Sequence, residues 1–351
     1  MIKRLIRDLL PYCLVRSIQR KKYGKSFFNL DNNQEIQQDV KSCFSTILSI
    51  QGFGCSGHTA LINLFQEYDN IQECTKNTSD GESSYEIDFM RLGGGVLDFE
   101  KYLDSSNIFQ NDAAYHRLLK QMASCLVFSE NTSCKALANR YLSMLLDMKL
   151  SNLSTVYYNG ALADKDSPDT SIYYIKNMPV KDFRHITRSF LTAVFNEFSC
   201  SGKDILMLDH FFTDYEWDMN TYKDYVPGIK VIALYRDPRD VYYYARQKNV
   251  EWIPHANVMG FINWCKKTYG KFDIHSSDFF PLRFEDLIMD YDFTVQKIEE
   301  YVGIDPKNHL YKKRFLNPEV SMNNISIWKN SPELAEDMET IKQSLGELCY
   351  N

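Results

Sequence analysis

The sequence predicts an α/β fold in which a central parallel sheet is flanked by helices. A β-rich run at residues 44–51 is followed by a glycine-rich turn and then by a helix that begins at Thr59. Three further apolar runs, each followed by a helical segment, lie at residues 205–208, 230–235 and 279–284. Such alternation of short strands and helices is typical of a parallel sheet covered by helices.

Helices are also predicted in the middle of the chain. Residues 96–149 have a helical pattern, with the strongest periodicity at 136–148. A single apolar stripe predicts another helix at 182–198. Residues 160–170 are polar and rich in turn-forming residues, so we expect an exposed insertion there.

The length and composition are those of a globular protein. Its 351 residues are 44% hydrophobic and 25% charged, which is enough to bury one large core. We expect a single domain over residues 44–351, with helical and loop insertions at about 70–180.

The first 25 residues differ in charge from the remainder of the chain. The net charge is −6, yet residues 1–25 carry eight basic side chains and one acid, Asp8. Apolar residues recur between them at helical spacing, which favours a helix lying against anionic lipids. The alternative is a basic helix docked on the acidic remainder. The apolar run at residues 9–15 is too short to cross a bilayer and contains Pro11.

These features predict where the protein works. No small-residue cleavage site follows the leader, so a secretory signal is not expected. The nine cysteines are odd in number and lack both CxxC spacing and histidines at metal-ligand intervals, which favours a reducing compartment without structural zinc. We expect a cytoplasmic protein that can lie peripherally on the inner face of the cell membrane through residues 1–25. No nucleic-acid partner is expected for the acidic chain.

The turn after the first strand has the composition of an anion-binding loop. Glycines let the backbone approach a phosphate closely, and the N–H groups of the following helix converge on such an anion. Two residues of the loop, Ser56 and Thr59, add hydroxyl donors. The loop is not a Walker A motif, which would need a lysine where His58 stands. A nucleotide phosphate is the expected ligand, but an ATPase or kinase is disfavoured.

A second phosphate-binding motif follows the strand at residues 230–235. The sequence Arg-Asp-Pro-Arg-Asp-Val occupies residues 236–241. An arginine at the carboxyl end of a parallel strand is well placed to bind a phosphate in the crevice there. The alternative is a turn closed by an Arg–Asp ion pair.

Together the two motifs resemble those of sulfotransferases that use 3′-phosphoadenosine-5′-phosphosulfate (PAPS). That family carries a 5′-phosphosulfate loop of the type PKSGTT or RSGSS, similar to residues 55–59, and a 3′-phosphate motif of the type RNPKDV, similar to residues 236–241. Residues 282–287 resemble its YEDL segment, and residues 321–329 resemble its late Trp-Lys loop. The resemblance covers roughly residues 44–345. The basic leader is similar to that of some bacterial surface-polysaccharide enzymes.

The resemblance implies a P-loop NTPase-like architecture and an enzyme that transfers the sulfonyl group of PAPS to a hydroxyl, which we expect to belong to a carbohydrate. PAPS would be the co-substrate and no metal is expected. The residues that it implies for the PAPS site are Gly54, Cys55, Ser56, Gly57, His58, Thr59, Arg236, Tyr244, Phe284, Trp328 and Lys329. His210 resembles the histidine that acts as general base in cytosolic members, in the context LMLDHFF.

Two positions depart from the family pattern. Cys55 stands where the loop normally carries Lys or Arg, so His58 is the nearest cation in the loop and a second catalytic candidate. Tyr244 stands where a serine usually completes the 3′-phosphate motif, and Arg239 or Arg246 could compensate. Asp209 is the substitute for His210 as base.

Two other classes stay open at this point. A catalytically inactive PAPS- or nucleotide-binding protein would account for Cys55 in place of the cation. A P-loop kinase-like transferase or a glycosyltransferase would use a different nucleotide. The acceptor is not encoded in any recognised motif, because the insertions are expected to form its pocket.

Overall fold

The chain forms two compact units, which are described separately. We call Cys43–Thr75, Ser199–Lys223 and Pro227–Asn351 the sheet unit, and Lys76–Phe198 with Asp224–Val226 the main part of the helical unit. A computed structural model describes residues 30, 39–77, 84–86, 90–103, 108–125, 127–128, 131–150, 172–211, 219–270 and 272–350. The leader at 1–25 and the insertion predicted at 160–170 lie outside these residues. No helix in the described ranges is long and apolar enough to cross a membrane.

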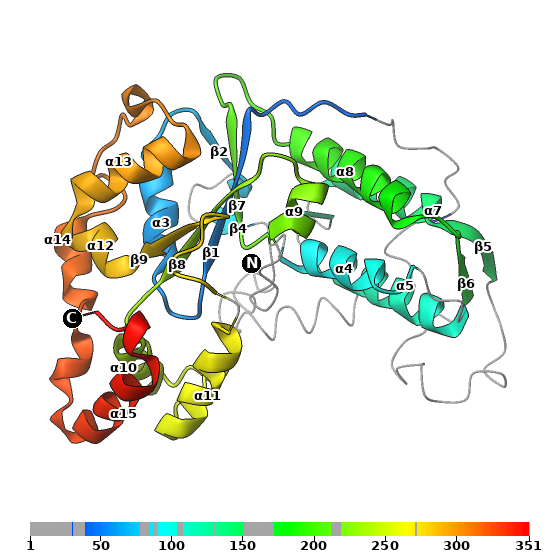
Figure 1. The fold of residues 1–351 in the computed structure, drawn as a ribbon. Helices are drawn as coiled ribbons and strands as arrows, with labels where there is room; N and C mark the ends of the chain where they lie inside the picture. The colour runs from blue at the N-terminus through cyan, green and yellow to red at the C-terminus, as the bar shows by residue number, and fades with distance from the viewer. Residues whose placement is uncertain are drawn as a thin grey trace, which may run out of the picture. The chain divides into compact units, whose positions relative to one another are not determined.

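A five-stranded parallel sheet forms the centre of the sheet unit (Figure 1). The strand order is β2-β7-β1-β8-β9, which confirms the predicted α/β class with a parallel sheet. The strands are β1 (Thr46–Gly52), β2 (Ile71–Glu73), β7 (Ile205–Asp209), β8 (Lys230–Tyr235) and β9 (Phe280–Arg283). Four of them lie where the apolar runs predicted strands, whereas the three-residue β2 was not predicted.

Helices follow the strands as the sequence predicts. Helix α3 begins directly after the glycine loop, and α10 begins after β8. The helices of this unit are α3 (His58–Phe65), α10 (Pro238–Lys248), α11 (Val258–Thr268), α12 (Phe284–Met289), α13 (Tyr291–Val302), α14 (Pro318–Ser321) and α15 (Ala335–Leu345). Helix α9 (Met219–Tyr225) has residues in both units, and five 3₁₀ turns complete the described elements: η1 (Pro306–Asn308), η2 (Met322–Asn324), η3 (Ile327–Asn330), η4 (Pro332–Leu334) and η5 (Gly346–Leu348).

The bounds of α10 follow from its terminal residues. The side chain of Asp237 accepts a hydrogen bond from the Arg239 amide at 2.8 Å, and Pro238 occupies the first helical position, where its missing N–H is not needed. Asn249 ends the helix in the left-handed conformation, with φ 47°. These caps fix the direction in which the helix leaves the end of β8.

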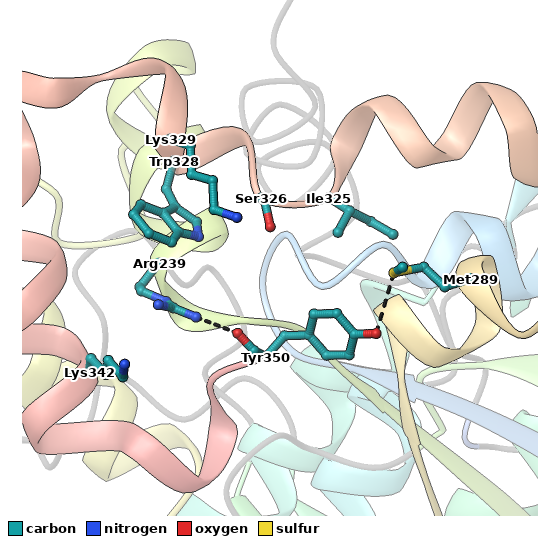
Figure 2. A pocket seen from close by; sticks show the side chains of 8 residues that line it. All are labelled: Arg239, Met289, Ile325, Ser326, Trp328, Lys329, Lys342 and Tyr350. Atoms are coloured by element: carbon teal, nitrogen blue, oxygen red, sulfur yellow. Dashed lines mark hydrogen bonds between the residues drawn. The ribbon is translucent and has the colours of Figure 1, made fainter.

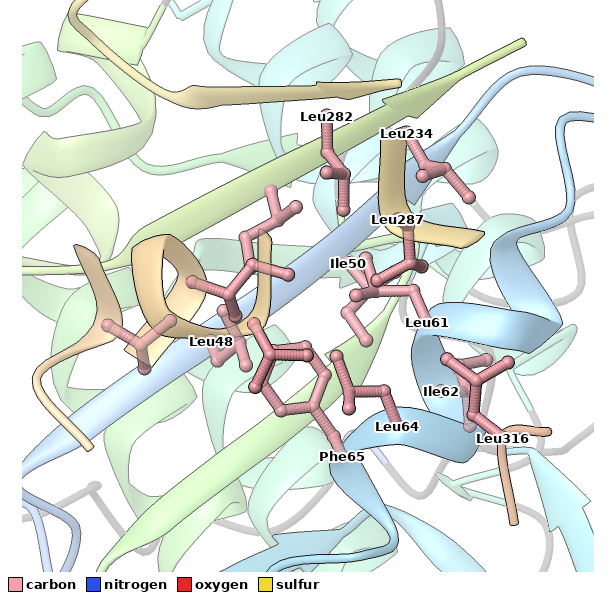
Figure 3. Packing of buried hydrophobic residues seen from close by; sticks show 14 of the residues in the cluster. Leu48, Ile50, Leu61, Ile62, Leu64, Phe65, Leu234, Leu282, Leu287 and Leu316 are labelled. Carbon is pink, nitrogen blue, oxygen red and sulfur yellow. The ribbon is translucent and has the colours of Figure 1, made fainter. Parts of the chain in front are cut away.

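One face of the sheet packs against α3, α12 and α13. Leu48 and Ile50 of β1 are fully buried in a cluster with Leu61 and Phe65 of α3 and Leu287 of α12 (Figure 3). Side chains two apart on a strand point to the same face, so this alternation holds β1 in register. A second cluster joins α10, α11 and α15 around Tyr242 and Phe261. These two clusters position both ends of the glycine loop.

The helical unit contains α4 (Met90–Glu100), α5 (Ile108–Ala123), α7 (Thr132–Met144) and α8 (Val180–Asn196). The predicted helix at 182–198 is therefore confirmed. The prediction of helix through residue 149 is wrong, because α7 ends at Met144 and β5 (Leu146–Leu150) pairs antiparallel with β6 (Ile172–Ile175). Apolar and polar residues alternate through Leu-Asp-Met-Lys-Leu, the period of a strand, but the run directly follows a helical pattern. A further short pair, β3 (Thr75–Asn77) and β4 (Ser84–Glu86), forms a separate two-stranded sheet.

A buried carboxylate holds the segment that follows η1. Glu67 is fully buried at the end of α3, and its Oε2 atom accepts hydrogen bonds from His309 at 2.8 Å and Tyr291 at 3.1 Å. Three backbone amides, of Lys313, Phe315 and Leu316, donate to the same carboxylate at 2.9 to 3.0 Å. Burial alone would raise the pKa of Glu67, but these hydrogen bonds lower it overall.

Replacing this carboxylate should destabilise the sheet unit. Glu67→Gln keeps the size of the side chain but turns an NH₂ group toward several donors, so we expect the free energy of unfolding to fall by about 3 kcal/mol. The lowered pKa means that the carboxylate's contribution is present at neutral pH and is lost as the pH falls. Urea denaturation at pH 7 measures the loss, with Glu300→Gln, at an exposed position of α13, as the control. Equal stability of the two variants would contradict this role of Glu67.

Candidate phosphate-binding site

The loop between β1 and α3 has the backbone of an anion-binding turn. Gly57 adopts the left-handed conformation with φ 89°, and Cys55 also has a positive φ of 60°. The first turn of α3 contains no acidic residue, so the positive end of its dipole is not neutralised there. Ser56 is fully buried, and its hydroxyl has no hydrogen-bond partner among the described residues. The loop therefore offers helix N–H groups and a buried hydroxyl to an anion.

Close packing explains three glycines in and beside the loop. A Cβ atom at Gly57 would lie 2.7 Å from Cδ2 of Phe284, and one at Gly52 would lie 2.7 Å from Cβ of His58. A Cβ at Gly54 would overlap the ring of Trp252. The sequence predicted Phe284 as a PAPS-site residue, and the structure places its ring against the loop.

Arg236 joins the loop to the late segment. It follows β8, the strand beside β1, and its side chain is only 5% exposed. Its Nη1 donates to the Cys55 carbonyl at 3.3 Å, and its Nη2 donates to the carbonyl of Asn324. The guanidinium also lies 5.2 Å from the centre of the Phe284 ring. Thus one arginine contacts three of the four segments on which the family resemblance rests.

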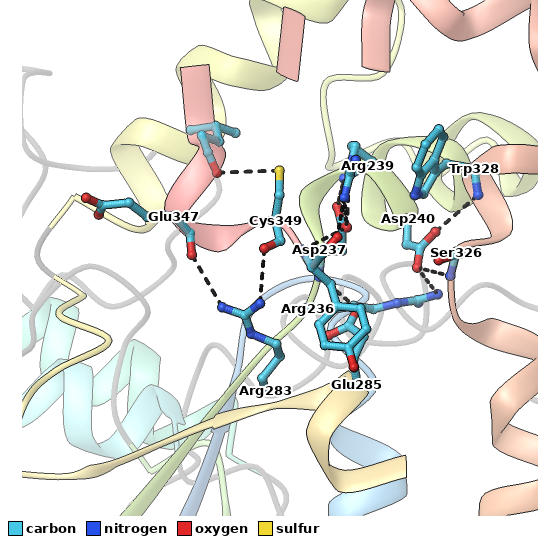
Figure 4. Close-up of polar contacts among 12 residues, drawn as sticks. Arg236, Asp237, Arg239, Asp240, Arg283, Glu285, Ser326, Trp328, Glu347 and Cys349 are labelled. Carbon is cyan, nitrogen blue, oxygen red and sulfur yellow. Dashed lines mark hydrogen bonds and ion pairs between the residues drawn. The ribbon is translucent and has the colours of Figure 1, made fainter. Parts of the chain in front are cut away.

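The second arginine of the motif has a different role. Arg239 forms a two-pronged ion pair with Asp237, with its Nη2 2.6 Å from Oδ2, and donates to the Tyr350 carbonyl at 2.6 Å. Figure 4 shows Arg239 against Asp237, whereas Arg236 extends toward Asp240 and Ser326. The ion-paired turn considered from sequence thus describes Arg239 best, whereas Arg236 lies 3.8 Å from Asp240 and donates its hydrogen bonds to backbone carbonyls.

Asp240 fixes the late segment on α10. This carboxylate is 1% exposed and accepts hydrogen bonds from the amides of Ser326 at 2.8 Å and Trp328 at 3.1 Å. The Trp328 ring lies over the Arg239 guanidinium at 4.6 Å. Burial raises the pKa of Asp240, an effect opposed by the charge of Arg236.

A cavity of about 420 Å³ opens beside this segment (Figure 2). Two predicted PAPS-site residues, Trp328 and Lys329, line it. The full lining is Arg239, Met289, Ile325, Ser326, Trp328, Lys329, Lys342 and Tyr350. The loop residues, Arg236 and Tyr244 are not among these, so only two of the predicted PAPS residues line the cavity.

Glu285 lies beneath the arginine motif. It is fully buried, and its Oε1 accepts a hydrogen bond from the Asp237 amide at 3.0 Å. Burial raises its pKa to about 7, and the nearby Asp237 contributes in the same direction. Neither Glu285 nor Asp240 was singled out from sequence, although both lie within the matched motifs. The acidic residues of the RDPRDV segment (236–241) and of the FEDL segment (284–287) could have indicated them.

His210, the predicted base, lies at the carboxyl end of β7. Its backbone has a positive φ of 48°, and its Nδ1 lies 2.5 Å from Oδ1 of Asp209. Its Nε2 lies 3.0 Å from the Gly52 carbonyl at the end of β1. The ring of His58 meets that of His210 edge to face, with centroids 4.8 Å apart. The structure therefore brings both predicted catalytic histidines to the start of the loop.

Neither His58 nor Cys55 gives the loop a positive charge in this structure. Burial and the charge of His210 lower the pKa of His58, so its imidazole is neutral at pH 7 in the free protein. Burial raises the pKa of the Cys55 thiol, although Arg236 opposes the shift. Thr59 is exposed on the first turn of α3, and Tyr244 is half-buried at the end of the second turn of α10. The positive charge recorded in contact with the loop belongs to Arg236.

Comparisons with known proteins give only distant likenesses. A scan against protein-family models and a search of curated proteins both find no match. The chain is similar to the sulfotransferase domain of the olefin synthase from Synechococcus PCC 7002, with 11% identity over 91% of this chain and 99% of that one, at a TM-score of 0.39. It is also similar to sulfotransferase STF9 from Mycobacterium avium, with 10% identity over 86% of this chain and 78% of that one, at a TM-score of 0.36. At these TM-scores the likenesses do not establish a shared activity.

Gly57 should be more sensitive to substitution than a glycine that shares only its backbone conformation. Gly57→Ala forces a left-handed alanine against Phe284, whereas Gly228→Ala, at φ 73°, places its Cβ in open space. We expect Gly228→Ala to lower stability by about 1 kcal/mol and Gly57→Ala by about 1–3 kcal/mol more. Denaturant unfolding of both variants measures the difference. Equal losses would show that Phe284 moves aside readily.

Glu285→Gln should remove a pH dependence of stability. Because its pKa is about 7 when folded, against an ordinary 4.5, the folded protein holds a proton that the unfolded chain releases between these values. Stability should therefore fall as the pH rises from about 5 to about 8, by roughly 3 kcal/mol, and the neutral glutamine should lack that decline. Urea denaturation at several pH values tests this. The control is Asp286→Asn, which removes an exposed carboxylate next to Glu285. If the free energy of unfolding of Glu285→Gln fell with pH as steeply as that of the wild type, Glu285 would not be the group that titrates.

Proposed function

We propose that this chain is a sulfotransferase that passes the sulfonyl group of PAPS to a hydroxyl acceptor. The observation that carries the proposal is a set of three buried donors, one in each of three segments that resemble the family. Ser56 Oγ, Arg236 Nε and Trp328 Nε1 are all buried and have no hydrogen-bond partner among the residues described. Buried polar atoms are normally paired, so each of these donors is available to a ligand.

The donors suit a ligand with two separate anionic groups. The Ser56 hydroxyl lies in the loop at the N-terminus of α3, where a 5′-phosphosulfate would meet the helix N–H groups. Arg236 lies at the end of the adjacent strand, where its guanidinium can bind a 3′-phosphate. Its present partners include two backbone carbonyls, which an anionic oxygen can replace with a stronger, charge-assisted bond.

Sulfonyl transfer makes three demands on the protein. The acceptor oxygen must lie in line with the bond that breaks, its proton must be removed, and charge on the departing oxygen must be stabilised. We assign the proton to the His210–Asp209 pair at the end of β7, and the stabilisation to the backbone amides of the loop and of the first turn of α3. Both ring nitrogens of His210 have partners in the free structure, so its ring must turn before it can accept a proton, or Asp209 accepts it directly.

The acceptor and the membrane contact are further proposals. A carbohydrate acceptor is supported by the likeness of the basic leader to polysaccharide enzymes, and contact with anionic lipid by its eight basic side chains. Both depend on residues 1–25, outside the described structure.

One observation favours a second candidate, a PAPS-binding protein without catalytic activity. The thiol of Cys55 has a raised pKa and the imidazole of His58 a lowered one, so neither residue places a positive charge in the loop. Binding could therefore persist where catalysis is weak. A P-loop kinase-like transferase is less well supported, because His58 stands where its lysine would be.

One pair of assays separates these candidates. Calorimetric titration with 3′-phosphoadenosine 5′-phosphate (PAP), ATP and UDP identifies the nucleotide, and transfer of radiolabelled sulfonyl groups from PAPS to a panel of glycans and phenols detects turnover. Sulfotransferase activity requires preference for PAP and label transfer. Tight PAP binding without transfer to any acceptor would support the binding protein, and preference for ATP would reject both.

Arg236→Ala should weaken PAP binding by roughly 1.5–3 kcal/mol, or about 10- to 150-fold, because it removes a charge-assisted hydrogen bond. Titration calorimetry measures the dissociation constant. Lys248→Ala, at an exposed position near the end of α10, removes a cation from the same helix and serves as the control. An unchanged dissociation constant in a folded Arg236→Ala variant would remove this arginine from the site.

A further inference from the structure

Three potential metal ligands converge at the carboxyl ends of β1 and β7. One ligand atom from each of His58, Asp209 and His210 lies within 4.8 Å of the other two. The side chains come from two elements, since His58 begins α3 while the other two residues follow one another at the end of β7. The sequence predicts no metal, because the cysteines and histidines lack metal-ligand spacing and the family resemblance implies none.

The hydrogen bonds of His210 fix which of its nitrogens faces the carboxylate. A backbone carbonyl can only accept, so the contact of Nε2 with the Gly52 oxygen at 3.0 Å requires a proton on Nε2. Nδ1 then faces Oδ1 of Asp209 at 2.5 Å. Two lone pairs cannot share that position, so a proton lies between the two atoms at this distance, and a metal could replace it only if the side chains move apart.

This arrangement is the one that metal-binding histidines adopt. A ligating histidine usually donates its other N–H to a carboxylate or a backbone carbonyl, which fixes the tautomer and the ring orientation. Here the Gly52 carbonyl would perform that role for Nε2, leaving Nδ1 to bind the metal. The His58 ring, 4.8 Å away edge to face, supplies the third ligand.

The backbone supports the trio from both sides. The His210 amide donates to the Ile50 carbonyl at 2.9 Å, which continues the β1–β7 pairing by one residue and holds the strained left-handed conformation of His210. Gly52 lets His58 approach, since a Cβ there would lie 2.7 Å from Cβ of His58. Both strands thus position the ligands before any ion binds.

We propose that His58, Asp209 and His210 bind a divalent transition metal, with Zn²⁺ as the best match. Mg²⁺ and Ca²⁺ prefer oxygen ligands only, and a set of two imidazole nitrogens and one carboxylate oxygen does not match that preference. Three protein ligands leave a fourth tetrahedral position open, as in catalytic zinc sites. The side chains must rotate slightly, because zinc ligands lie about 2.0–2.2 Å from the ion.

A metal here has a chemical consequence that rests on the proposed function. A dication beside Gly52 would supply the positive charge that Cys55 does not, and would lower the pKa of an acceptor hydroxyl bound at the open position. His210 would then be a ligand and not the base. Metal binding itself does not depend on this consequence.

Cobalt provides a test that is independent of activity. Chelator-treated, dialysed full-length protein is titrated with Co²⁺, whose visible absorption reports ligand number, and then with Zn²⁺ in competition with a chromophoric chelator. We expect a single equivalent to bind, with absorption typical of tetrahedral cobalt. His58→Ala and Asp209→Asn should each weaken zinc binding by about 100-fold or more, beyond the 10- to 100-fold typical of losing a ligand's supporting partner. His275→Ala removes an exposed histidine of the same unit and should change nothing.

Two outcomes overturn the proposal: no stoichiometric binding by the wild type, or equal affinity in all three variants, which would indicate surface histidines. Two ligand variants guard against misfolding of one of them, and circular dichroism identifies a variant that has unfolded. PAP titration of the same metal-free samples separates the two hypotheses. Intact PAP binding with no metal binding rejects only the metal site, whereas metal binding without PAP binding rejects only the sulfotransferase.

Discussion

The contact between Arg236 and the Cys55 carbonyl determines the arrangement of the site. Arg236 leaves β8 as a nearly buried cation, and a buried charge is stable only when paired and hydrogen-bonded. Its partners are the carbonyls of the loop and of Asn324, with Asp240 at 3.8 Å. Satisfying one guanidinium therefore requires the loop, α10 and the late segment to lie together. A ligand phosphate that replaced a carbonyl would take over an arrangement already formed.

The acids around the two arginines are not equivalent. Asp237 is neutralised by Arg239 and caps α10, and Asp240 accepts two backbone amides near Arg236. Glu285 is fully buried and accepts the Asp237 amide, and burial is the largest cause of its pKa of about 7. A phosphate bound at Arg236 would add negative charge nearby and raise that pKa further. Anion binding should thus favour the protonated form of Glu285, so the motif can take up a proton with its ligand.

Local patterns carried much of this information in the sequence. The strand at 230–235 and the glycine loop after β1 were predicted because their signals lie within a few residues. The three-residue β2 was missed because it pairs with β7, whose residues lie more than 130 positions later. The pattern predicts helix through residue 149, because the strand period of Leu146–Leu150 is too short to outweigh the helix before it. The sequence RDPRDV also could not show which arginine pairs with Asp237. Arg239 does so while it donates to the carbonyl of Tyr350, a residue at the far end of the chain.

The location of positive charge is the remaining constraint on the proposed sulfonyl transfer. In the sulfotransferase loop that residues 55–59 resemble, a cation stabilises the leaving oxygen. In this chain Cys55 and His58 are both neutral. The strand order places β7 and β8 on either side of β1, and each ends in a charged group: the Asp209–His210 pair on β7 and Arg236 on β8. A proton between Nδ1 and the carboxylate makes an ion pair without net charge, so only a bound metal would place positive charge on the β7 side. Under the proposed function, a metal at the end of β7 would supply beside the loop the positive charge that the loop itself lacks, while Arg236 at the end of β8 binds the second anionic group.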